Sequence, residues 1–241
     1  MAQGVTVRDA VSVTSSTPST APSTEADAPS LLRRAGTAIP VALLAGAILG
    51  GLAWLSDDLG YPAGLLIPAN LVGVWCLVAF GAGAGARSVF GGAGRGLFAL
   101  LAAVAVYYLA YGLLGEGWRA AGAGRAAVIW GSVALLAGPT LGLAGSVWRH
   151  RQGTARSLGI AVPAGVLISE GLLFGSQVAS DPAARSLLTV EVLVGVALPV
   201  FLVRGMRAKL IGLGAAVLVA VASLVGLLVV LPALRAAADT F

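Results

Sequence analysis

Long apolar runs separated by short polar turns make up most of the chain. Seven runs can be read from the sequence, over residues 35–55, 70–86, 97–114, 127–148, 160–179, 187–203 and 210–231. At about 1.5 Å per residue, runs of about 17 to 23 residues cover a hydrocarbon core of roughly 30 Å. The pattern predicts an all-α, polytopic bundle of seven transmembrane helices, with the second and sixth spans the shortest.

The two ends of the chain differ from this middle part. Residues 1–34 are rich in Ser, Thr, Pro and Ala and are too polar to form a core, which predicts a disordered tail. The transmembrane domain then covers residues 35–231, and residues 232–241 form a short second tail.

Composition supports the membrane class. Hydrophobic residues make up 58% of the chain and charged residues 10%, whereas a soluble domain has about 25% charged residues. The basic residues stand alone or in twos and threes at the ends of the apolar runs, so nucleic acid is not an expected partner. The expected environment is the lipid bilayer of the cell membrane.

Basic residues near the ends of the runs predict the orientation. The side that carries the N-terminus has Arg33, Arg34, Arg87, Arg95, Arg149, Arg151, Arg156, Arg204, Arg207 and Lys209, and the other side has Arg119, Arg125, Arg185 and Arg235. Positive charge favours the cytoplasmic side, so we expect a cytoplasmic N-terminus and a C-terminus outside the cell.

Short similarities between runs suggest an internal repeat. Residues 45–56 resemble 164–176, residues 71–74 match 193–196, and residues 97–106 resemble 210–219, all in the same order. These matches are consistent with a parallel arrangement of three spans, one linker span and three spans. Alanine, leucine, glycine and valine alone also produce such identities by chance, so both interpretations stay open.

Glu170 is the most informative polar residue. It lies roughly 20 Å from the inner end of the fifth run, with Ser169 beside it and Gln177 seven residues further along. Seven residues are two helical turns, so these side chains form one stripe that must face the bundle or a wet cavity. Because burial disfavours a charged carboxylate, we expect Glu170 to be protonated or hydrogen-bonded to hydroxyl groups.

Two tyrosines in the third run are candidate partners of this acid. Tyr107 and Tyr111 lie one turn apart on one face, and Tyr111 matches the depth of Glu170. Together with Gln177, these residues form a candidate site for a proton or a solute.

The other acids are expected to be solvated. Glu191 lies about four residues from the outer end of the sixth run, where it can reach headgroups or water. Asp57 and Asp58 are expected in a solvated turn after the first run. Asn70 is expected to cap the second span and to line a vestibule on the outer side of the membrane.

Several chemistries lack the residues they need. The chain has one cysteine and one histidine, so no internal disulfide, metal site or cofactor is expected. No metalloprotease, phosphate-binding or Ser/His protease pattern is present, so we expect the protein not to be an enzyme. Glycine pairs four residues apart indicate close helix crossings, either within the bundle or in homo- or hetero-oligomers.

A family resemblance rests on a few short motifs. They are Asn70 with Trp75, Tyr107–Tyr108, Gly138–Pro139 with Gly142, and Glu170–Gly171. Over residues 70–235 the chain resembles a family of small actinobacterial integral membrane proteins classed as a domain of unknown function. Arginine-rich, lysine-poor composition also favours a bacterial source.

Two functions therefore remain open. The first is a non-enzymatic multi-pass membrane protein that acts by association, as an accessory or scaffold subunit, with Glu170 as a structural hydrogen-bond clip. The second is a small proton-coupled or solute transporter or channel that uses Glu170.

Overall fold

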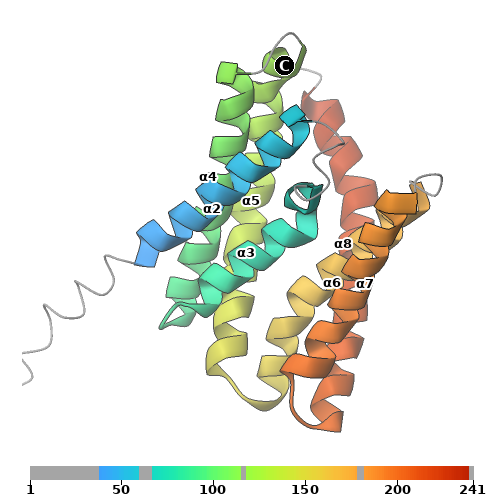
Figure 1. The fold of residues 1–241 in the computed structure, drawn as a ribbon. Coiled ribbons are helices and arrows are strands. Elements are labelled where there is room, and N and C mark those ends of the chain that lie inside the picture. The colour runs from blue at the N-terminus through green and yellow to red at the C-terminus, as the bar shows by residue number, and fades with distance from the viewer. Residues whose placement is uncertain (1–37, 60–66, 115–117, 178–181, 239–241) are drawn as a thin grey trace, which may run out of the picture.

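The computed structural model describes residues 38–59, 67–114, 118–177 and 182–238, and this part of the chain is helical without a strand (Figure 1). The helices are α2 (Ala38–Leu59), η3 (Ile67–Asn70), α3 (Val72–Ala84), α4 (Val89–Leu114), α5 (Trp118–His150), α6 (Gly153–Gln177), α7 (Pro182–Leu202) and α8 (Met206–Ala238). Six of them are long and apolar enough to cross a membrane, namely all but η3 and α3. The expected multi-pass helix bundle is confirmed at this level. The two predicted tails lie outside the described residues, except for the end of α8.

The predicted second span differs from the structure. Helix α3 has only 13 residues, Val72–Ala84, and at about 1.5 Å per residue it covers about 20 Å of a hydrocarbon core of roughly 30 Å. It begins in the middle of the bundle, after the single turn η3, and runs towards the end where α4 starts (Figure 1). The second run is therefore a helix too short to span the core, because Asn70, Leu71, Gly85 and Ala86 are not part of it.

Glycines allow the helices to approach each other closely. A side chain at Gly46 or Gly50 of α2 would collide with the backbone carbonyls of Ala99 and Ala103 in α4. Gly96 and Gly142 make a similar approach between α4 and α5, where a side chain at Gly96 would come within 2.7 Å of the Cα of Gly142. These small-residue faces are thus used within the chain.

Helix pairing agrees only in part with the predicted repeat. Helix α2 packs along α4, and α6 packs along α8, as equivalent pairs should. The two middle helices differ, because α7 packs mainly on α6 whereas α3 lies against α4, α5 and α6. The repeat therefore stays a prediction.

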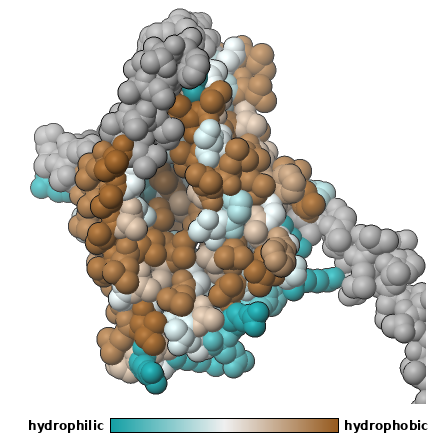
Figure 2. Space-filling view, turned by 180° about the vertical axis from the view of Figure 1, so that it is seen from behind, coloured by the Kyte–Doolittle hydropathy of each residue, from teal (hydrophilic) through white to brown (hydrophobic). Residues whose placement is uncertain are grey.

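Polar side chains gather at one end of the molecule. Figure 2 shows apolar side chains over much of the visible flank and hydrophilic ones at the lower end. Arg149, Arg151 and Arg204 are exposed in or beside the turns α5–α6 and α7–α8. The His150 ring lies 2.5 Å from the Ala86 carbonyl oxygen and so ties the α5–α6 turn to the α3–α4 turn. An apolar flank with one basic end is what a membrane-spanning bundle requires.

Candidate functional site

The first turn of α3 is held by Glu170 of α6. The backbone N–H of Val72 donates to Oε1 of Glu170 at 2.7 Å, and that of Gly73 donates to Oε2 at 2.5 Å. The first N–H groups of a helix have no partner within it, and Leu71, which precedes α3, supplies no side-chain cap. A carboxylate is the favoured partner there, because the helix dipole is positive at its N-terminus. Glu170 therefore caps a helix that starts inside the bundle.

Helix α7 adds a second acid to this point. Glu191 is 4% exposed, as is Glu170, and the two carboxyl groups lie close together beside Gly73. A methyl group at Gly73 would collide with Oε1 of Glu191 and lie 3.3 Å from Oε2 of Glu170. The two carboxyl groups and the start of α3 thus meet in one small volume.

The expectation for Glu191 was wrong. Helix α7 begins at Pro182, not at residue 187, so Glu191 lies more than two turns inside the helix and on the face towards α6. It cannot reach headgroups or water from this buried position.

Two buried carboxyl groups this close together are not both charged, so one of them carries a proton. As a carboxylate, Glu191 would have two buried oxygens without a donor among the described residues. Glu170 already accepts one backbone N–H at each oxygen, which suits the charged form. The geometry therefore favours Glu191 as the proton donor and Glu170 as the acceptor.

The predicted stripe on α6 is buried where it can be described. Ser169 is 2% exposed and its hydroxyl donates to the Val166 carbonyl of its own helix at 2.8 Å. Ser169 is thus not the partner of Glu170, whose partners are backbone N–H groups and Glu191 instead of hydroxyls. Gln177 is the last residue of α6, and its side chain lies outside the described residues.

The two candidate tyrosines belong to a different cluster. Tyr107 and Tyr111 of α4 donate to Oδ2 of Asp57 at 2.5 and 2.7 Å. Asn70 of η3 donates to Oδ1 of the same carboxylate at 2.6 Å. The predicted set is therefore divided, with Glu170 at the start of α3 and the tyrosines around the end of α2.

Two further expectations are corrected at this cluster. Asp57 is not in a solvated turn, because it lies in the last turn of α2, half-buried and hydrogen-bonded to three side chains. Asn70 does not cap α3, whose N-cap is Leu71. Asp58, in contrast, is exposed.

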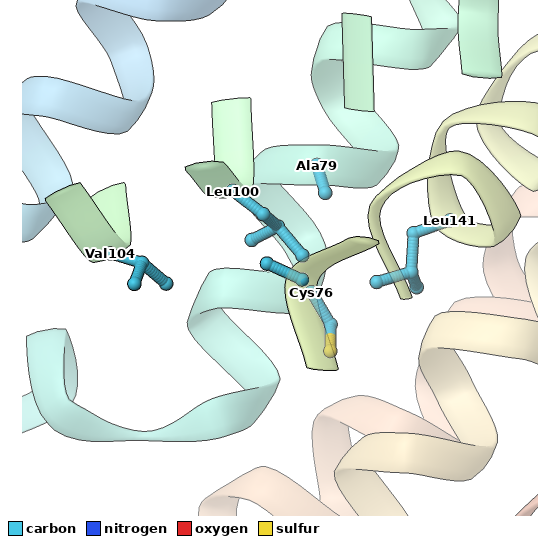
Figure 3. Packing of buried hydrophobic residues seen from close by; sticks show 6 residues of the cluster. Cys76, Ala79, Leu100, Val104 and Leu141 are labelled. Atoms are coloured by element: carbon cyan, nitrogen blue, oxygen red, sulfur yellow. The ribbon is translucent and has the colours of Figure 1, made fainter. Parts of the chain in front are cut away.

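A cavity of about 190 Å³ adjoins this cluster, between α3, α4 and α5. Trp75, Tyr107, Tyr108 and Trp130 line it, with Asn70 at one side. The non-aromatic part of its wall includes Cys76, Leu100 and Val104. Figure 3 shows Leu100 beside Cys76, with Val104 further along α4. Trp75 is fixed by a hydrogen bond from its ring N–H to the Ala69 carbonyl at 2.6 Å and by an edge contact with Tyr107.

Among the described residues, no group of three or more His, Cys, Asp or Glu side chains could hold a metal ion. Glu170 and Glu191 form a pair without a third such ligand.

Comparison with known proteins gives a family. Residues 29–233 match the model of a family described as of unknown function, DUF6518. The chain belongs to DUF6518. The DUF6518 match begins before α2 and so includes the first helix, which the resemblance seen in the sequence had left out. No curated protein and no solved structure matches the chain.

Sequence reasoning missed two residues of these clusters, Asp57 and Glu191. A signal existed for Glu191, because it and Glu170 are both acids within apolar runs, and two such acids are easier to bury together with one proton than apart. For Asp57 no local signal existed, because Tyr107 is 50 positions away along the chain.

Proposed function

We propose that this DUF6518 protein is a non-enzymatic, multi-pass protein of the plasma membrane that moves a proton, as a small transporter or channel. The observation that carries the proposal is the second buried acid. Glu191 has no described donor for either oxygen, and it lies against Glu170 at the start of a helix that begins within the bundle.

A structural function alone leaves Glu191 unexplained. One carboxylate or amide is enough to accept the two N–H groups of α3, and Glu170 does so. Burying a second acid at this depth lowers the stability of the fold, and acids inside membranes typically mark ion or proton pathways. Helices that start at mid-membrane depth are also typical of transporters.

The predicted orientation indicates where the Glu170–Glu191 pair lies in the membrane. We take the basic end as cytoplasmic, so α3 runs from mid-membrane to the cytoplasmic face, and the Asp57 cluster lies on the outer side of the Glu170–Glu191 pair.

The protein is expected to be actinobacterial, as the sequence resemblance implies.

The test is proton flux through the purified full-length chain in liposomes. The liposomes contain a pH-sensitive dye, and a potassium gradient with valinomycin sets the membrane potential. We expect the dye to respond faster than in empty liposomes, and Glu191→Gln to reduce the response to that of empty liposomes. The glutamine side chain has nearly the same size, and the N–H bonds of α3 to Glu170 are untouched, so the clip is kept while the transferable proton is removed.

Thr189→Val is the matched control on α7. Thr189 is exposed and its hydroxyl bonds to the Arg185 carbonyl of its own helix at 2.8 Å, so flux should stay at the wild-type level. Equal flux in Glu191→Gln and wild type, or no wild-type flux above empty liposomes, would overturn the proposal.

A second candidate function is that of an accessory or scaffold subunit. It is favoured by the two N–H bonds of Glu170, which act as a clip between α6 and α3 whether or not a proton moves. This function predicts wild-type activity of the partner complex in Glu191→Gln and loss of assembly in Glu170→Ala, measured by size-exclusion chromatography of the complex.

A further inference from the structure

The cavity between α3, α4 and α5 has an unusual wall. Four of its lining residues are aromatic: Trp75, Tyr107, Tyr108 and Trp130. They come from the three consecutive helices α3, α4 and α5, and Tyr107 makes edge contacts with Trp75 and Tyr108 at ring-centroid distances of 6.0 and 4.8 Å. Several aromatic faces around one space form a site that attracts cations through the electron-rich faces of the rings.

Two carboxylates are hydrogen-bonded to residues that line this cavity. None of the residues that line it is charged, but two of them, Tyr107 and Asn70, donate to the Asp57 carboxylate directly behind the wall. On another side, Val72 lines the cavity and its N–H donates to Glu170. The surroundings therefore favour a positive guest.

Asp57 also changes how the Tyr107 side chain can interact with a guest in the cavity. Because the Tyr107 hydroxyl donates its hydrogen to Asp57, the phenol oxygen presents only lone pairs elsewhere. Donation to a carboxylate makes the ring more electron-rich, which strengthens its attraction for a cation. A neutral guest gains nothing from the more electron-rich ring.

Cavity size limits the guest to a few atoms. The volume of about 190 Å³ compares with a cavity of about 150 Å³ that accepts benzene in another protein, and drug-sized ligands need about 300 Å³ or more. With Asn70 and the tyrosine hydroxyls as polar groups in a largely apolar wall, the cavity suits a compact cation with an apolar surface.

We propose that this aromatic cavity binds a small alkylammonium cation. This cation would be the solute of the proposed transporter, so its transport rests on the proposed function. Its binding does not, because binding needs no proton movement.

The test is a binding titration of the purified full-length chain in detergent, followed by tryptophan fluorescence and calorimetry. The probes are choline and its neutral isostere, in which carbon replaces the quaternary nitrogen. We expect saturable binding of choline and binding of the isostere at least tenfold weaker. Equal binding of the two probes, or no saturable signal with choline, would overturn the proposal.

Variants locate the site. Trp130→Leu removes one aromatic face and should weaken choline binding about tenfold, while Trp130→Phe keeps an aromatic face and should lose less. Trp148→Phe is the control, because Trp148 packs on Phe80 in a different part of the bundle, and binding should be unchanged. A loss in Trp148→Phe equal to that in Trp130→Leu would contradict the proposed location.

Asp57→Asn separates charge from shape. It should weaken choline binding and leave binding of the isostere unchanged, and equal weakening of both probes would contradict the electrostatic part of the argument. Because no proton is measured here, failure of binding with intact proton flux removes only the alkylammonium site. Intact binding without proton flux removes only the proposed transport of protons.

Discussion

Two polar clusters inside the bundle each centre on a carboxyl group, and they differ in where its hydrogen-bond donors come from. Glu170 is held by backbone N–H groups of α3 and lies beside a second acid, whereas Asp57 is held by three side chains, of Tyr107, Tyr111 and Asn70. Backbone donors at a helix start have no substitute in a lipid environment. Side-chain donors of half-buried residues can turn to water instead.

The difference implies different consequences when each cluster is disturbed. Changes at the Glu170–Glu191 pair leave buried groups without partners, so they should affect the whole fold. Changes at Asp57 should be milder for stability.

Gly73→Ala should have the largest effect. The added methyl would collide with Glu191 and Leu167, and overpacking of this kind lowers the free energy of unfolding by about 2 to 3 kcal/mol. Thermal unfolding in detergent, followed by circular dichroism, measures the loss. Gly81→Ala on the same helix is the control, because no atom lies within 4 Å of the added methyl; equal melting of the two variants would remove the steric argument.

Glu170→Ala should come next, with a loss of about 2 kcal/mol or more in the free energy of unfolding. It leaves two N–H groups of α3 without an acceptor and Glu191 without its partner. Asp57→Ala, measured in the same micelles, should lose less. If Asp57→Ala were the more destabilising of the two, the proposed difference between the clusters would be wrong.

Tyr107→Phe should have a smaller effect, about 0.6 to 1 kcal/mol, as is usual for a hydrogen bond between helices in membranes. A double-mutant cycle with Asp57→Ala isolates the pair. The coupling energy should account for most of the single-variant loss, since the ring stays in place, and a coupling of zero would mean that the hydroxyl contributes through another contact.

Ser169→Ala should have the smallest effect, within about 0.5 kcal/mol. Although Ser169 is next to Glu170 and equally buried, its hydroxyl bonds only to the Val166 carbonyl of its own helix. Chemical unfolding should give nearly the wild-type midpoint. A loss as large as that of Glu170→Ala would place the hydroxyl in the acid cluster.

The sequence predicted the helices well because lipid imposes a simple rule. A chain in a bilayer must satisfy its backbone within each segment, so an apolar run of sufficient length is a helix. The same rule could not predict the length of α3. Apolar residues indicate burial, and protein surroundings can bury an extended residue such as Leu71 as well as a helical one.

The site was predicted less completely, since depth along one helix does not show which helices are neighbours. Tyr111 and Glu170 were placed together by matched depth, but Tyr111 faces Asp57 of α2. Glu191 was placed at the surface because the start of α7 was put at residue 187 instead of Pro182. The first error concerns a contact between distant segments, on which local pattern carries no information, and the second concerns the residue at which a helix begins.

The short length of α3 has a consequence for the order of events during synthesis. The acceptor of its first N–H groups is Glu170, 98 positions after Val72. At about 5 to 20 residues per second, those 98 residues take about 5 to 20 s to be made. A segment too short to cross the bilayer alone must wait through that interval for its acceptor, so the nascent chain has to be sheltered at the insertion machinery until α6 arrives.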